Sequence, residues 1–307
     1  MTTTNTRHMT TTRGFQTDIL PWRLYQKAKK LAWDPATIDY SREKADWESR
    51  EPGMRRLVAR LATTFMIGEE AVTLDIVPLL RAISDEGRIE ESLFLTTFLG
   101  DEAKHAEFFR TWFDTIGDDM DLEALLADSQ RRVFDEELPR AMGRLENDRS
   151  PEAFLDASLT YNHFVEGVLA MTGYYTWDRM FAMQDIFPGM RAGLEMVQRD
   201  ERRHLAYGTY LCRRIVAEHP ETWTFVEKRM GELRELGLAF VDDIGAAIFD
   251  EFKANAGEVD AAQFEALAKG IMAEFTNYGQ DLITRRTEAI AKARTTSDIE
   301  GDLEDDV

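Results

Sequence analysis

The sequence is poor in the residues that end helices and in the residue that cross-links chains. Its 307 residues include only 8 prolines, 19 glycines and one cysteine, Cys212. One cysteine excludes an intrachain disulfide and suits a reducing compartment, so we expect a buried, unreactive Cys212 and a cytoplasmic protein. Abundant alanine, leucine and glutamate favour helix, and no strand-like alternation of useful length appears. The sequence therefore predicts an all-α protein.

Long apolar runs and an excess of positive charge are also missing. Charged residues at helical spacing interrupt every hydrophobic stretch, so no segment reaches the roughly 18 apolar residues that a membrane span needs. The formal net charge is −20, from 57 acidic and 37 basic residues. A chain this acidic repels a phosphate backbone. We therefore expect neither a membrane span nor a nucleic-acid partner.

Four long amphipathic stretches occupy the centre of the chain, with apolar residues three and four positions apart. They are expected at about 54–82, 88–115 and 150–181 and after Pro188-Gly189. Pro78 should kink the first stretch near its end. Ser150 and Pro151 supply an N-cap and a first-turn proline for the third. Further helical patterns lie at roughly 20–33, 39–49, 120–146, 221–253 and 261–294.

The two ends of the chain differ from this pattern. Residues 1–14 are Thr-rich and lack the apolar centre of a secretory signal, so we expect a disordered leader. Residues 295–307 are acidic and apolar-poor, which predicts a disordered, solvated tail. No Pro- or Ser-rich linker divides residues 15–294, and we expect them to form one domain.

Two of the five histidines belong to a repeated motif. The copies are Asp101-Glu102-Ala103-Lys104-His105 and Asp200-Glu201-Arg202-Arg203-His204. Residues three apart project to the same side of a helix, so the Glu oxygen and the His nitrogen of each copy can reach one metal ion. One Glu-x-x-His is a weak signal, but two copies that share the preceding Asp are much harder to obtain by chance.

Two further glutamates, Glu69 and Glu166, occupy central positions in the apolar stripes of the other two long helices. Burying four carboxylates and two imidazoles in one core costs several kcal/mol per charge unless cations compensate them. One Glu from each of two helices and Glu-x-x-His from each of the other two is the ligand set of ferritin-like dinuclear carboxylate proteins. Oxygen and imidazole donors suit iron or manganese. We therefore predict a ferritin-like four-helix bundle core with additional flanking helices, and these metal ligands: Glu69, Glu102, His105, Glu166, Glu201 and His204.

The order of these ligands resembles the small subunit of ribonucleotide reductase, over roughly residues 20–290. Phe109 stands four residues after the first ligand His, where that family usually carries its radical tyrosine. A stable tyrosyl radical at this position is therefore excluded, although tyrosine-less reductase subunits with a manganese/iron centre remain an alternative. Val72 and Tyr161 match the pair that becomes an ether cross-link in the small-subunit-like ligand-binding oxidases. The chain is most similar to that group.

This resemblance implies an oxidase that activates O2 at one manganese and one iron ion, with a di-iron centre as the other option. Manganese would lie on the side of Glu69, Glu102 and His105, and iron on the side of Glu166, Glu201 and His204. The resemblance also implies a homodimer, and a long-chain fatty acid or similar apolar carboxylate in an apolar channel. We expect Phe65, Phe98 and Leu169 to contribute to that channel.

Three residues near the ligands have expected supporting roles. Asp200 matches the acid that orients His105, because a ligating imidazole needs its second N–H anchored. Asp101 is interpreted as a solvated acid. Trp33 corresponds either to the tryptophan that passes electrons to the metals in reductase subunits or to an ordinary core tryptophan.

Three other functions are weighed against the oxidase. A reductase subunit is disfavoured by the tail, since residues 295–307 contain no aromatic residue with which to dock a large subunit. A fatty-acyl desaturase or hydroxylase shares the paired motifs and differs in needing an external electron donor. Iron storage is disfavoured by the helices expected beyond the bundle.

Overall fold

The computed structural model describes residues 8–181, 185–255, 261–295 and 299–303. Within these ranges every regular element is a helix, as the composition predicts. The bundle helices are α4 (Pro52–Asp75), α6 (Ile89–Ile116), α9 (Pro151–Ser158) continued by η5 (Leu159–Ala170) and α10 (Met171–Phe181), and α11 (Pro188–Glu218). Among the described residues, no helix has both the length and the apolar character needed to cross a bilayer.

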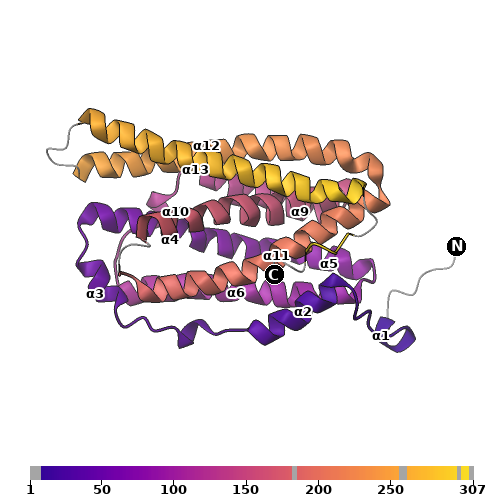
Figure 1. Ribbon diagram of the computed structural model, residues 1–307. Coiled ribbons are helices and arrows are strands. Elements are labelled where there is room, and N and C mark those ends of the chain that lie inside the picture. The colour runs from indigo at the N-terminus through magenta and orange to yellow at the C-terminus, as the bar shows by residue number, and fades with distance from the viewer. Residues whose placement is uncertain (1–7, 182–184, 256–260, 296–298, 304–307) are drawn as a thin grey trace.

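The remaining helices surround this bundle (Figure 1). They are α1 (Met9–Thr12), α2 (Leu20–Leu31), η1 (Pro35–Thr37), α3 (Glu43–Glu48), α5 (Val77–Asp85), η2 (Glu123–Leu125), α7 (Asp128–Arg131), η3 (Arg132–Glu137), α8 (Leu138–Gly143), η4 (Arg144–Glu146), η6 (Pro220–Thr222), α12 (Trp223–Asn255), α13 (Ala261–Ala291) and η7 (Lys292–Arg294). The long helices α12 and α13 lie side by side along one flank, whereas α2 packs on α6 and α11. The predicted ferritin-like bundle with flanking helices is confirmed.

Local sequence signals explain where the bundle helices begin and end. The hydroxyl of Ser150 accepts a hydrogen bond from the Ala153 N–H, so Ser150 is the predicted N-cap of α9. The expected kink at Pro78 is a full break, with α4 ending at Asp75 and α5 starting at Val77. Proline there has no N–H for the preceding turn, and its ring crowds that turn.

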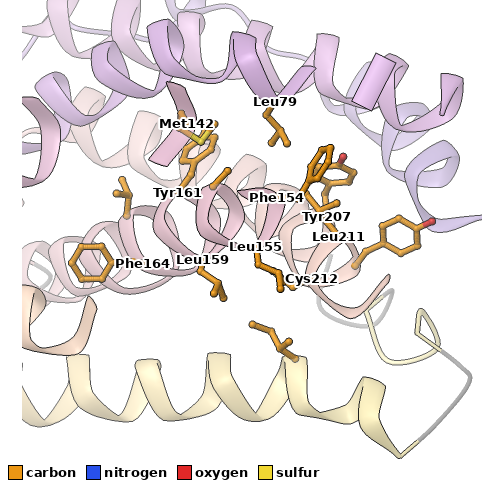
Figure 2. Close-up of a cluster of buried hydrophobic side chains, with 14 of the residues drawn as sticks. Leu79, Met142, Phe154, Leu155, Leu159, Tyr161, Phe164, Tyr207, Leu211 and Cys212 are labelled. Carbon is orange, nitrogen blue, oxygen red and sulfur yellow. The ribbon is translucent and has the colours of Figure 1, made fainter. Parts of the chain in front are cut away.

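The third bundle helix departs from α geometry over the twelve residues of η5, which form a π-helix. A π-helix pairs residues five apart instead of four, and such segments are frequent at functional sites. Buried side chains pack around η5; Figure 2 shows Leu155, Leu159 and Cys212 between the bundle and the C-terminal helix. Cys212 is buried, as predicted, and burial raises the pKa of its thiol to about 12.

Parts of both segments for which we predicted disorder fold against the domain. Arg13 makes two hydrogen bonds of 2.8 Å to the carboxylate of Glu90. Near the other end, Arg213 on α11 binds Asp302, and Leu303 is buried. Charge pairing to individual buried partners is not visible in the composition of an acidic or Thr-rich segment, which explains the difference. Residues 1–7, 296–298 and 304–307 lie outside the described residues.

Candidate metal centre

Six side chains from four helices converge in the middle of the bundle, and they are the six predicted from the motifs. Each of them is at least nine-tenths buried. Their ligand atoms form two groups, each within 4.8 Å: Glu69, Glu102, His105 and Glu201, and then Glu102, Glu166, Glu201 and His204. Glu102 and Glu201 belong to both groups. These two carboxylates would therefore be available to a metal ion held in either group.

The two imidazoles are oriented alike. His105 Nδ1 lies 3.3 Å from Glu69 Oε2, and His204 Nδ1 lies 3.0 Å from Glu102 Oε1, so both Nδ1 atoms face the carboxylates. The Nε2 atoms point outward, each to an aspartate that precedes the other motif: His105 to Asp200 at 3.3 Å and His204 to Asp101 at 3.5 Å. The expectation for Asp200 agrees with this geometry.

The interpretation of Asp101 as a solvated acid is wrong. Asp101 is only 6% exposed, and its carboxylate binds Lys104 at 2.7 Å and Arg203 at 3.0 Å. The same two cations bind Asp200, at 2.8 and 2.6 Å. Although burial raises the pKa of both aspartates, the facing imidazoles and these cations lower it below the usual range. Both aspartates are therefore held ionised behind the histidines.

Lys104 and Arg203 were not identified from the sequence, although a signal was present. Each stands immediately before the histidine of its motif, so the two copies share a basic residue as well as Asp, Glu and His. A helix turns about 100° per residue, which directs this position away from the metals and toward the acid of the other copy. Trp33 joins the same network, because its indole N–H donates to Asp200 at 2.7 Å.

The carboxylates inside the centre are short of positive charge. Burial raises the pKa values of Glu69 and Glu166 well above the usual range. For Glu102 burial acts the same way, but His204 and His105 outweigh it and lower the pKa. Nothing in the described structure hydrogen-bonds to the buried Oε1 of Glu166. Because an unpaired buried carboxylate oxygen is costly, the donor set fits two divalent cations, which would balance four carboxylates.

Tyr161 reaches the centre through the π-helix. Its hydroxyl donates a 3.0 Å hydrogen bond to Glu102 Oε1. On an ideal α-helix a residue five before Glu166 points well away from it, but the i to i+5 geometry of η5 brings both to one side. Val72 is buried and lines the cavity that also contains Glu102. Tyr161 therefore contacts a carboxylate that lines the same cavity as Val72.

An apolar cavity of about 90 Å³ adjoins the centre, and four of the six candidate ligands line it: Glu69, Glu102, Glu166 and Glu201. Phe65 and Leu169 line it as predicted. The expectation for Phe98 is wrong, because its ring stacks on His204 with centroids 3.6 Å apart and lies outside the cavity lining. A phenylalanine on the same stripe as a ligand can face either side of it, and the sequence does not distinguish the two.

Two aromatic residues lie next to the cavity wall. Phe109, at the position of the radical tyrosine, is fully buried and stacks on Phe65 at 5.5 Å. The ring of Tyr174 also stacks on Phe65, with centroids 4.9 Å apart. The buried hydroxyl of Tyr174 has no hydrogen-bond partner within the described structure. Sequence reasoning missed Tyr174, because a tyrosine eight residues after Glu166 carries no metal-ligand spacing.

Comparison with known proteins shows to which family this architecture belongs. The family model of the ribonucleotide reductase small chain matches residues 18–261. The chain belongs to this family. Members are oxidoreductases, so the enzyme class predicted from the sequence is confirmed.

Solved structures narrow the resemblance within the small-chain family. An R2-like ligand-binding oxidase with an aerobically reconstituted Mn/Fe cofactor is 35% identical, covers 90% of this chain and 94% of its own, and has a TM-score of 0.81. A variant of such an oxidase with an anaerobically reconstituted Mn/Fe cofactor is 34% identical, covers 91% of this chain and 96% of its own, and has a TM-score of 0.82. The resemblance to ligand-binding oxidases is thereby confirmed.

Proposed function

We propose that this small-chain family member is an oxygen-activating oxidase that holds one manganese and one iron ion. The observation that carries the proposal is the convergence of six buried ligands in two overlapping groups. Manganese would be held by Glu69, Glu102 and His105, and iron by Glu166, Glu201 and His204. The Mn/Fe cofactor of the similar oxidases supports this choice over a di-iron centre. The bound pair would supply the reduction of O2 coupled to oxidation of a C–H bond.

The chain itself positions the ligands and controls their protons. Asp200 hydrogen-bonds to His105 Nε2, and Asp101 lies 3.5 Å from His204 Nε2, so each aspartate is placed to hold a proton on the outer nitrogen and leave Nδ1 for a metal. Lys104 and Arg203 keep both aspartates ionised. Phe98 stacked on His204 covers one side of the centre and keeps water from it.

We also propose that the cavity takes a long-chain fatty acid or similar apolar carboxylate. Apart from the four ligand glutamates, most of its wall is hydrocarbon, including Phe65, Val165, Leu169, Phe240 and Phe275. Apolar walls bind an acyl chain, and a pair of cations at one end would attract the carboxylate head group. We further propose a homodimer, which the family resemblance implies, in the cytoplasm, which the single cysteine favours.

The proposed oxidation includes an ether bond between Tyr161 Oη and Val72 Cβ. The bond forms as the O–H of the phenol and the C–H of Cβ break with loss of two protons and two electrons in all, and O2 takes up both to give hydrogen peroxide. Burial and Glu102 raise the pKa of the Tyr161 phenol well above its usual range, so the hydroxyl keeps its proton until it is oxidised. Glu102 Oε1, already hydrogen-bonded to this hydroxyl, is placed to accept the proton.

The cross-link can be tested by mass spectrometry. Protein loaded with manganese and iron and exposed to O2 should become lighter by two hydrogens, and tryptic digestion should release the Val72 and Tyr161 peptides joined. Tyr161→Phe is the matched control, since it removes only the hydroxyl. Separate peptides after complete metal loading and oxygen exposure would make the reductase subunit the leading alternative.

A radical-generating reductase subunit is the second candidate, and one contact favours it. Trp33 donates to Asp200, which in turn contacts His105, so an indole is connected to a ligand by two short contacts. In that role the chain would bind a large partner subunit with nucleotide-dependent affinity. A pull-down with such a partner distinguishes this candidate from the oxidase.

A further inference from the structure

Two residues of the cavity wall, one on α12 and one on α13, pack directly against each other. Gly245 on α12 and Met272 on α13 both line the cavity. A Cβ added at Gly245 would lie 1.8 Å from Met272 Cε and 2.4 Å from its Sδ. The Met272 side chain therefore occupies the space that any side chain at position 245 would need.

The contacts of α13 show where along the cavity this pair lies. A Cβ at Gly167, next to ligand Glu166, would be 3.1 Å from Arg286 Nε. The ring of Phe275 instead packs edge-on against Tyr175, with centroids 6.1 Å apart. From residue 286 back to residue 275 of α13, the partner on the third bundle helix changes from Gly167 to Tyr175, which is eight residues or roughly 12 Å farther along that helix and away from Glu166.

Met272 lies almost one further turn in the same direction. On α12 the register agrees, because Gly237 faces Phe164, two residues before Glu166, and Gly245 is eight residues beyond Gly237. Both helices therefore place the pair at the end of the cavity remote from the metal ligands.

We propose that Met272, seated over Gly245, closes the remote end of the cavity and sets the length of acyl chain that the protein accepts. This inference rests on the proposed fatty-acid ligand and adds the residue that selects among fatty acids. A head group fixed at the metal end extends its chain toward Met272. A methionine side chain is unbranched and flexible, so it can close the cavity and still move aside when a long acyl chain reaches it.

Chain-length preference follows directly from this position. Each methylene that enters the apolar cavity should tighten binding about fourfold, from roughly 0.8 kcal/mol per buried methylene, until the chain end meets Met272. In Met272→Ala the limit should move to longer chains. In Gly245→Ala the new methyl group must displace the flexible end of Met272 into the cavity, so the limit should move to shorter chains.

The experiment titrates metal-loaded protein with saturated fatty acids from decanoic to eicosanoic acid. We expect the tightest-binding length to increase in Met272→Ala, to decrease in Gly245→Ala, and to stay unchanged in Met272→Leu, which keeps the side-chain volume. Circular dichroism and metal content verify that each variant is folded and loaded. Lipid extracted from the purified proteins and weighed by mass spectrometry provides a second readout.

The outcomes separate this inference from the function on which it rests. Wild-type protein that binds fatty acids with one unchanged optimum in all three variants would overturn the role of Met272 alone. Wild-type protein that binds no fatty acid of any length would overturn the proposed ligand and the length limit together.

Discussion

Among the buried charge clusters in the described part of the bundle, those around Asp156 and around Glu102 differ in where their cations come from. Asp156 on α9, 3% exposed, is matched by the chain itself: Arg140 makes two hydrogen bonds of 2.9 Å to it, and Arg229 approaches to 2.9 Å. Around Glu102 and Glu201 the described ion pairs come from His105 and His204 rather than from lysine or arginine, since Lys104 and Arg203 bind the aspartates behind the histidines.

The pKa shifts follow this difference. At Asp156 burial raises the pKa, but the arginines more than reverse it and lower the value below the usual range. At Glu69 and Glu166 burial dominates and the pKa values rise. A buried carboxylate by itself is thus no sign of a metal site. The sign is a buried carboxylate cluster that faces histidines and, among the described residues, forms no ion pair with lysine or arginine.

The largest expected effect is the loss of bound metal when candidate ligands are substituted. Protein purified from manganese- and iron-supplemented cells should contain about two transition-metal ions per chain. Glu102→Ala should lose at least one of them, because this carboxylate belongs to both ligand groups. The double variant His105→Ala, His204→Ala should lose nearly all. Full occupancy in the double variant, measured by elemental analysis, would show that the metals bind elsewhere.

Removing the carboxylate of Asp156, whose charge Arg140 and Arg229 balance, should lower stability and leave the metal content unchanged. Asp156→Ala leaves arginine charge without its buried partner and should cost about 3–5 kcal/mol of unfolding free energy. Its metal content should stay at the wild-type level. Asp114→Ala, which removes an exposed partner of Arg110, is the matched control and should change stability little. Urea unfolding measures both, and a metal-poor but stable Asp156→Ala protein would contradict the distinction.

Removing both metals should destabilise the bundle by an amount similar to the loss of Asp156. Ions that bind only the folded state stabilise it by about 2.7 kcal/mol per site at a hundredfold excess over the dissociation constant. Chelation should therefore lower the melting temperature of the wild-type protein. The double-histidine variant should melt at the same temperature with and without chelator, and a chelator-dependent shift in it would count against the assigned ligands.

The two aspartates behind the histidines should have equal and smaller effects. Asp200→Asn and Asp101→Asn each remove the charge that anchors an imidazole, and we expect metal affinity to fall about 10–100-fold in both. Competition with a chelating dye measures this. An effect confined to Asp200→Asn would restore the interpretation of Asp101 as a bystander.

The smallest expected effect is the loss, at low pH, of the stabilisation that ionised Asp156 provides. The pKa of Asp156 is lowered in the folded protein, so its stabilisation is present above the unfolded value of about 3.9 and is lost as pH falls through the folded value. The stability gap between wild type and Asp156→Asn should therefore narrow from pH 5 toward pH 3. Metal release at low pH affects both proteins alike. A gap independent of pH would indicate that Asp156 acts through packing.

The motifs sufficed to predict the helical fold and the six converging side chains, because ligand spacing and helix periodicity are both local in sequence. What could not be predicted depends on contacts between distant helices. The burial of Asp101 requires Arg203 from α11 beside it, and the side of the stripe on which Phe98 lies depends on His204. The π-helix at η5, which brings Tyr161 to Glu102, has no signature in the composition of the segment.

Anomalous X-ray diffraction from crystals of metal-loaded protein, recorded at the manganese and iron absorption edges, tests the central claim most directly. We predict two peaks among the six ligands: manganese beside Glu69, Glu102 and His105, and iron beside Glu166, Glu201 and His204. Iron in both positions would overturn the manganese assignment. No peak among these side chains, with metal found elsewhere or nowhere, would contradict the dinuclear centre itself.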